Sequence, residues 1–210
     1  LTAAGATNFE GAVGSGTSTE IGDGTGAAIT INSAGVTEFD STLETQSGIT
    51  SANGAGTITF RGDVTLAAGN TATTLINAVT NLDGLTFTSA GAVTFGNDAA
   101  NDQVNLTTAD VAIATTGAGD DVTFTSKLDG RFDLTLNTVG ASLFSGAVGS
   151  GGTGEIGDAT GAAITINSTG ATEFDSTLET QSGIASANGA GAITFRGDVT
   201  LAAGNTATTL

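Results

Sequence analysis

The 210-residue chain contains no cysteine, proline, methionine, tryptophan, tyrosine or histidine. Without cysteine there is neither a disulfide framework nor a thiolate metal site, and the redox compartment stays undetermined. Without histidine or cysteine, a serine nucleophile would need an unusual lysine or carboxylate base. The lack of proline and of a glycine at every third position excludes collagen. No apolar run approaches the roughly 18 residues of a membrane-spanning helix, so we expect no membrane insertion.

Basic residues are almost as scarce as the missing types. The chain has 4 of them against 21 acidic residues, and its net charge is -17. Nucleic-acid binding therefore has almost no electrostatic support, and an anionic membrane would repel the chain. Disorder is the first interpretation of a glycine-rich acidic sequence. It conflicts with a hydrophobic content of 39% and with the regular alternation of apolar and polar residues.

The sequence does contain a long internal repeat. Residues 1–75 align with residues 136–210 without a gap at an offset of 135, and 61 of the 75 positions are identical. We therefore predict one continuous repetitive segment over 1–210, with a full period at 1–135 and a partial second period at 136–210. We also expect it to be a fragment of a longer repetitive protein. Two stretches return unchanged: Thr37–Ile49 as Thr172–Ile184, and Ile58–Leu75 as Ile193–Leu210.

Short runs alternate apolar and polar residues with a period of two, as half-buried strands do. Examples are Ile29–Ile31 and Val122–Phe124. No segment of helical length carries a 3.6-residue period. The sequence therefore predicts an all-β protein with almost no helix.

A finer unit recurs inside the period: an alternating strand, a glycine corner and a second strand. Five such units in 135 residues predict a parallel β-helix with about 27 residues per coil and about eight coils. We expect the corner glycines to supply positive φ angles. Tandem β-sandwich domains are the alternative, but 135 residues is long for one and the smaller unit has no place in it. The units are ITINSAGVTEF at 29–39, LTFTSAGAVTF at 85–95, LTLNTVGASLF at 134–144, VNLTTADVAIA at 104–114 and ITFRGDVTL at 58–66.

Four phenylalanines share one position in this unit. We predict that they point inward and stack along the axis of the solenoid. They are Phe39, Phe95, Phe144 and Phe174.

The segments LTLNTVGASLFSGAVGSGG at 134–152 and LTAAGATNFEGAVGSG at 1–16 resemble the repeats of filamentous-haemagglutinin-like adhesins and autotransporter passenger regions. The resemblance implies a right-handed β-helix that is secreted or displayed on the surface of a Gram-negative-type bacterium. It implies roles in adhesion, biofilm or matrix formation.

Paired carboxylates raise the question of catalysis. Glu38 and Asp40 lie two apart on one strand, so their side chains share a face about 7 Å apart, a spacing that suits a glycosidase pair. Glu44 is a further neighbour in sequence. The trio recurs as Glu173, Asp175 and Glu179, and an active site copied in every repeat is a poor interpretation. We therefore predict a solvated acidic face and no enzyme activity.

Calcium is the better hypothesis for the acidic loops, because a hard cation prefers several carboxylate oxygens. The segment TTGAGDDVTF at 115–124 resembles one turn of a calcium-binding nonapeptide repeat, and a second loop combines acids with Asn97 and Asn101. The same residues also favour turns without an ion. No other cofactor is expected. The candidate ligands are Asp98, Asp102, Asp120 and Asp121.

The tripeptide that integrins recognise occurs twice. Its position between two short strands also fits a plain corner in which the charged side chains face solvent. Both interpretations stay open. The residues are Arg61, Gly62 and Asp63, and Arg196, Gly197 and Asp198.

Together these patterns predict a structural repeat segment of a secreted or cell-surface bacterial fibre, stalk or extracellular-matrix protein. The chain itself is the expected partner, through end-to-end stacking of coils or neighbouring repeats in a fibre. The alternative is an adhesin shaft that binds a host receptor or glycan through its loops.

Overall fold

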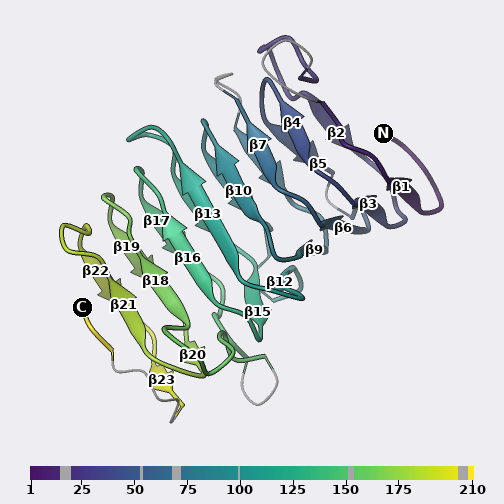
Figure 1. The fold of residues 1–210 in the computed structure, drawn as a ribbon. Helices are drawn as coiled ribbons and strands as arrows, with labels where there is room; N and C mark the ends of the chain where they lie inside the picture. The colour runs from purple at the N-terminus through teal and green to yellow at the C-terminus, as the bar shows by residue number, and fades with distance from the viewer. Residues whose placement is uncertain (15–19, 53, 68–71, 99, 151–153, 203–207) are drawn as a thin grey trace.

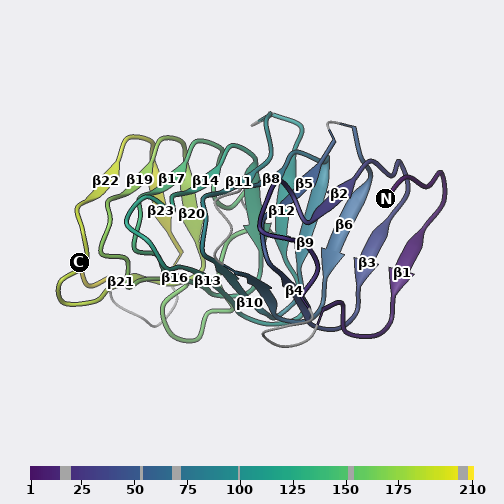
Figure 2. The same cartoon turned by 90° about the horizontal axis from the view of Figure 1, so that it is seen from above.

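The computed structural model describes residues 1–14, 20–52, 54–67, 72–98, 100–150, 154–202 and 208–210. These residues form 23 strands and no helix, so the described part of the chain has no helix that could cross a bilayer. The strands stack as a β-solenoid of about 7 turns with about 23 residues per turn, and the termini lie at opposite ends of the stack (Figure 1, Figure 2). The all-β parallel solenoid predicted from the sequence is therefore confirmed.

The strands form three long faces, and successive strands along the chain move from one face to the next. Face A contains β1 (Thr7–Phe9), β3 (Thr37–Phe39), β6 (Thr57–Phe60), β9 (Val79–Leu82), β12 (Gln103–Leu106) and β15 (Lys127–Gly130). It continues through single bridges at Val148 to β20 (Leu178–Thr180) and β23 (Val199–Leu201).

Face B contains β4 (Leu43–Thr45), β7 (Val64–Leu66), β10 (Thr86–Ser89), β13 (Val111–Thr115), β16 (Leu134–Asn137), β18 (Ile164–Ile166) and β21 (Ile184–Ser186). Face C contains β2 (Ile29–Ile31), β5 (Ile49–Ser51), β8 (Thr73–Leu75), β11 (Val93–Phe95), β14 (Val122–Phe124), β17 (Ser142–Phe144), β19 (Thr172–Phe174) and β22 (Ile193–Phe195). Each pairing between strands of neighbouring turns is parallel, which rules out the antiparallel β-sandwich alternative for the described residues.

The predicted coil of 27 residues was too long, and about 7 turns are observed against the predicted count of about eight. The observed turn has about 23 residues, because the strand–corner–strand unit recurs at different corners of the solenoid. The unit at 29–39 joins face C to face A, whereas the unit at 85–95 joins face B to face C. Spacing between units therefore does not measure one turn. Paired residues of neighbouring turns lie between 20 and 30 positions apart, because the loops differ in length.

Alternation along each strand builds the core. In β13, Val111 and Ile113 are buried while Ala112 and Ala114 are partly exposed, and the same inward and outward pattern runs through most strands. Valine, isoleucine, leucine and phenylalanine supply the inward positions, and threonine fills many outward ones. These residue types suit a pleated surface that is buried on one side.

One 135-residue repeat does not complete a whole number of turns of the solenoid. It ends one face short, so each strand and its copy in the second repeat lie on different faces. β3 lies on face A, but its identical copy β19 lies on face C. In the same way β2 on face C becomes β18 on face B, and β4 on face B becomes β20 on face A. A second copy of the repeat therefore presents the same strands on a neighbouring face of the rod.

The phenylalanines follow this shift through the core. Phe9, Phe39 and Phe60 stack on face A, and five others stack on face C from Phe95 to Phe195. Phe87 on face B joins the two stacks by edge contacts, with ring centroids 6.0 Å from Phe60 and 5.7 Å from Phe95. The four predicted inward phenylalanines are all buried. Phe39, however, does not belong to the same stack as Phe95, Phe144 and Phe174.

Several turn glycines have the predicted positive φ angle, among them Gly84 and Gly96, but Gly35, the corner glycine of the unit at 29–39, does not. A Cβ atom there would lie 2.3 Å from the carbonyl oxygen of Gly5, and one on Gly56 would lie 2.4 Å from the carbonyl oxygen of Gly35. Glycine is needed at this corner because the backbones of successive turns approach closely, not because of φ.

Candidate functional site

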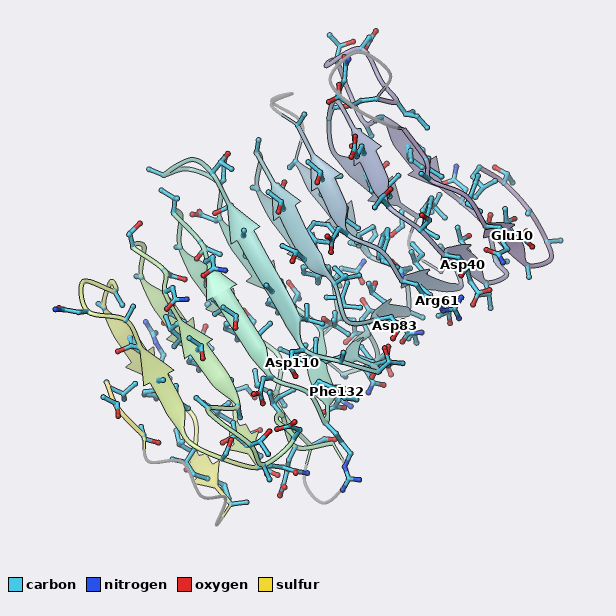
Figure 3. The ribbon with its side chains drawn as sticks, viewed as in Figure 1. Glu10, Asp40, Arg61, Asp83, Asp110 and Phe132 are labelled. Carbon is cyan, nitrogen blue, oxygen red and sulfur yellow. The ribbon has the colours of Figure 1, made fainter. Side chains whose placement is uncertain are left out.

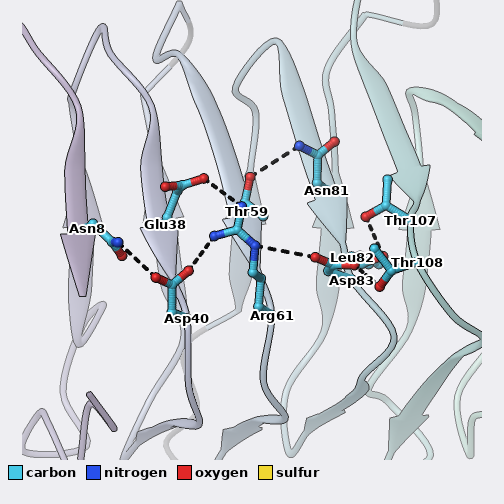
Figure 4. A network of polar contacts seen from close by, with 10 residues as sticks. All are labelled: Asn8, Glu38, Asp40, Thr59, Arg61, Asn81, Leu82, Asp83, Thr107 and Thr108. Atoms are coloured by element: carbon cyan, nitrogen blue, oxygen red, sulfur yellow. Dashed lines mark hydrogen bonds and ion pairs between the residues drawn. The ribbon is translucent and has the colours of Figure 1, made fainter. Parts of the chain in front are cut away.

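The most connected polar group lies at the edge where face A turns toward face B. Arg61 pairs through Nη2 with Glu38 Oε1 at 2.9 Å, through Nε with Asp83 Oδ2 at 3.4 Å, and through Nη1 with Asp40 (Figure 4). Asp40 also accepts a hydrogen bond of 2.8 Å from Asn8 Nδ2. Figure 3 shows Glu10, Asp40, Arg61 and Asp83 following one another along this edge.

The parallel register explains why these side chains meet. The backbone N–H groups of Asp40, Arg61 and Asp83 each donate to the carbonyl of the last residue of the strand one turn earlier. Each residue therefore lies directly beside its counterpart in the next turn. Opposite charges at equivalent positions stabilise neighbouring strands, and this network holds three successive turns in register.

Both copies of the integrin-type tripeptide lie at corners. Arg61 is engaged by three carboxylates, and Asp63 Oδ1 accepts a 2.9 Å hydrogen bond from the Thr86 backbone N–H. In the second copy, Arg196 pairs with Glu173 and, at 3.3 Å, with Asp175. The arginine and aspartate thus already have roles in the corner. Integrin recognition stays a prediction.

The carboxylates Glu38 and Asp40, whose spacing raised the question of catalysis, lie on this same edge. Hydrogen bonds from Asn8 and Arg61 lower the pKa of the Asp40 carboxyl below its ordinary value. A general acid for glycoside cleavage needs a raised pKa instead. The geometry therefore favours the charged form of Asp40 as a partner of Arg61.

A second ladder of polar side chains runs along the outer side of face A. Asn105 Nδ2 donates to Asn81 Oδ1 at 2.9 Å, and Asn81 Nδ2 donates to Thr59 Oγ1 at 3.2 Å. Asn167 and Asn137 form the same contact on face B, also at 2.9 Å. Such ladders satisfy amide groups turn by turn and favour exact stacking of successive coils.

The four calcium candidates fall into two separate loops. Asp102 Oδ2 accepts hydrogen bonds from the backbone N–H groups of Asn97 and Asp98, at 2.8 Å and 3.1 Å. The Asp98 carboxylate accepts hydrogen bonds from the Ala100 backbone N–H and from the Asn101 side-chain amide. Asp121 Oδ1 accepts from the Ala141 N–H at 2.7 Å. These contacts are those of turn-forming residues. Among the described residues, no group of three or more histidine, cysteine, aspartate or glutamate side chains is placed to hold a metal ion.

An acidic group that sequence reasoning missed surrounds Asp133. Burial, helped by the nearby charges of Asp110 and Asp158, raises the pKa of Asp133 to about 6. Its Oδ1 is buried without a hydrogen-bond partner in the described part of the chain. Asp133 and Asp110 are adjacent only because of the register of β13 and β16. No local sequence signal marks that contact.

A groove on the outer side of face A was also missed. It has a volume of about 500 Å³ and lies beside β12, β15 and the turn that follows β15. Asp129, Arg131 and Phe132 line it. Arg131 forms no ion pair within the described ranges, in contrast to Arg61 and Arg196.

These features define the class of protein: a parallel β-solenoid with a stacked apolar core and polar ladders on its outer faces. Comparison with protein-family models, with curated proteins and with solved structures finds no match.

Proposed function

We propose that this chain is a structural repeat segment of a secreted or cell-surface bacterial fibre, stalk or extracellular-matrix protein. The observation that supports the proposal is the unbroken pairing across the boundary between the two copies of the repeat. On face B, Leu134 of the first copy pairs with Ile164 of the second, and on face C Val122 of the first copy pairs with Ser142 of the second. The repeat therefore lengthens a rod instead of adding a separate domain.

The shift of one face per repeat fits the same role. A longer array would turn the acid–arginine edge to each face of the rod in succession. Such a rod carries copies of the acid–arginine edge on all of its faces. This arrangement suits a fibre that has neighbours on every side. Its negative charge opposes uncontrolled lateral association.

Electron cryomicroscopy of proteins with added copies of the 135-residue repeat tests the rod. Each copy contributes slightly fewer than six turns of about 23 residues. We therefore expect the rod to lengthen by about 27 Å per copy at roughly 4.8 Å per turn. A string of separate globular beads would contradict the proposal.

The location needs its own experiment. Antibodies against the chain should label unpermeabilised producing cells or the material around them. Labelling that appears only after permeabilisation would overturn the secreted or cell-surface part of the proposal while leaving the rod intact.

A further inference from the structure

Only one asparagine in the described part of the chain is followed directly by glycine. Asn188 precedes Gly189 in the corner that joins β21 to β22. The side-chain amide of an asparagine reacts with the backbone nitrogen of the next residue when the two groups meet, and a side chain on that next residue hinders their approach. Glycine has no Cβ atom and removes this obstacle. The corner therefore holds the pair of residues in which this reaction meets the least steric resistance.

The backbone of this corner forms an open turn. The Ala190 N–H donates to the carbonyl oxygen of Ala187 at 3.0 Å, and Gly189 has a φ angle of 89°. A positive φ at the third position is that of a type II turn, in which Asn188 takes the second position. Asn188 and Gly189 are exposed, and a Cβ atom built on Gly189 would meet nothing within 4 Å. The Asn188 side chain therefore has room to fold over the following peptide group.

The two reacting groups are also free. Among the described residues, neither the Gly189 N–H nor the Asn188 side-chain amide forms a hydrogen bond. The flanking residues are held by the preceding turn of the solenoid, because the Ala187 N–H donates to the Ile166 carbonyl at 2.9 Å and the Gly191 N–H is bonded in the same way. The solenoid thus fixes both ends of the turn and leaves its two central residues without contacts that oppose the reaction.

Other asparagines lack this combination. Asn101 is followed by Asp102, whose N–H donates to the carbonyl oxygen of Asp98 at 2.9 Å. Asn167 is followed by a serine, and its own Nδ2 donates to Asn137 at 2.9 Å. In the first case the attacking nitrogen is engaged, and in the second the amide is held in a ladder between turns.

We propose that Asn188 is a site of spontaneous deamidation and isomerisation. The Gly189 nitrogen gives up its proton to hydroxide and bonds to Asn188 Cγ, and the side-chain nitrogen leaves as ammonia. The product is a succinimide ring. Water then opens the ring at one of its two carbonyl groups and gives aspartate or isoaspartate at position 188. The net change consumes one water molecule, releases one ammonia and needs neither an oxidant nor a cofactor.

The repeat multiplies this chemistry along the rod. The sequence of the first copy has the same pair of residues at 53–54. The turn there is alike, since the Ala55 N–H donates to Ala52 at 3.0 Å and Gly54 has a φ angle of 80°. Each conversion adds one negative charge to a corner, and isoaspartate also lengthens the backbone by one carbon. The inference does not depend on the proposed structural role, because it needs only this one turn.

Peptide mapping by mass spectrometry on the whole folded chain tests the proposal. Trypsin releases one peptide between Arg131 and Arg196 that contains Asn137, Asn167 and Asn188, so the three sites are compared within one molecule. After incubation at mildly alkaline pH, we expect conversion at Asn188 to be more than about tenfold faster than at the other two. Chromatography separates the aspartate and isoaspartate forms of the peptide.

Two variants isolate the reacting groups. Asn188→Gln lengthens an exposed side chain, so it should abolish fast conversion at this position and leave the melting temperature unchanged. Gly189→Ala should slow conversion, because its Cβ atom hinders closure of the ring. Since alanine is strained at a positive φ, this second variant is also compared with the unaltered chain in guanidinium, where both are unfolded.

Three results would overturn the proposal. One is equal conversion at the three asparagines of the folded chain. Another is a folded chain that keeps Asn188 intact for as long as the unfolded chain needs to convert it, because the turn would then block the reaction. The third is the absence of conversion in both states. None of these results bears on whether the chain forms a fibre.

Discussion

Phe144 and Phe174 stack with ring centroids 4.7 Å apart and planes within 9° of parallel. They are the copies of Phe9 and Phe39, which stack at 5.0 Å. The first pair lies on face C and the second on face A. The same aromatic contact is therefore reproduced on two faces of one core, because each face offers the inward position of a parallel strand.

Replacing Phe144 should destabilise the solenoid strongly. The ring is fully buried between Phe124 and Phe174. We expect Phe144→Ala to lower the free energy of unfolding by roughly 3–5 kcal/mol, measured by urea denaturation. Phe144→Leu retains much of the volume and should cost less. Thr123→Ala, on the outer side of β14, is the control, and an equal loss there would contradict this account.

Gly56 should not tolerate a side chain. Its Cβ would lie 2.4 Å from the backbone oxygen of Gly35, so Gly56→Ala forces two turns apart. We expect a loss of roughly 1–3 kcal/mol, as in overpacked cores. Gly119→Ala is the matched control, because nothing lies within 4 Å of its added Cβ and its φ is not positive. Equal melting temperatures for the two variants would refute close turn packing as the reason for this glycine.

Because the Asp133 carboxyl is partly buried, we expect the free energy of unfolding to fall as the pH rises. Its folded-state pKa of about 6 is above the ordinary 3.8, so the folded state binds more protons between these values. The free energy of unfolding therefore decreases from about pH 4 to pH 6, and the penalty is complete above that range. Asp133→Asn should stabilise the chain at pH 8 and change little at pH 3.5. The gain should be roughly 1 kcal/mol, since the carboxyl is partly solvated.

Thermal melting at several pH values measures this effect. Asp198→Asn removes an exposed acid and controls for net charge. A pH-independent difference between Asp133→Asn and the unaltered chain would show that charge burial at Asp133 is not its cause.

Arg61 and Arg196 should differ in their contribution to stability. Arg61 bridges three carboxylates with its side chain 40% exposed, whereas Arg196 bridges two and is 62% exposed. We expect Arg61→Ala to cost about 1 kcal/mol and Arg196→Ala less, by urea denaturation at low salt. The two costs should converge at high salt, because screening weakens surface pairs. A difference that persists in high salt would point to packing of the Arg61 stem instead.

The sequence by itself determined the strands and their inner and outer sides. Alternation of residues such as Val122, Thr123 and Phe124 predicted a β-solenoid with buried phenylalanines, since side chains on a strand point to opposite faces in turn. It also predicted that Glu38 and Asp40 lie on one side of their strand. These are properties of a few consecutive residues.

Only the tertiary structure decided which face each strand occupies and which side chains meet between turns. The face depends on the accumulated length of all preceding loops, so Phe39 and Phe174 lie on different faces despite identical local sequence. The contacts of Asp133 with Asp110, and of Asp129 with Gln103, join residues more than 20 positions apart. Their register is fixed by pairing of whole turns, because each turn must bury its apolar side chains against the next.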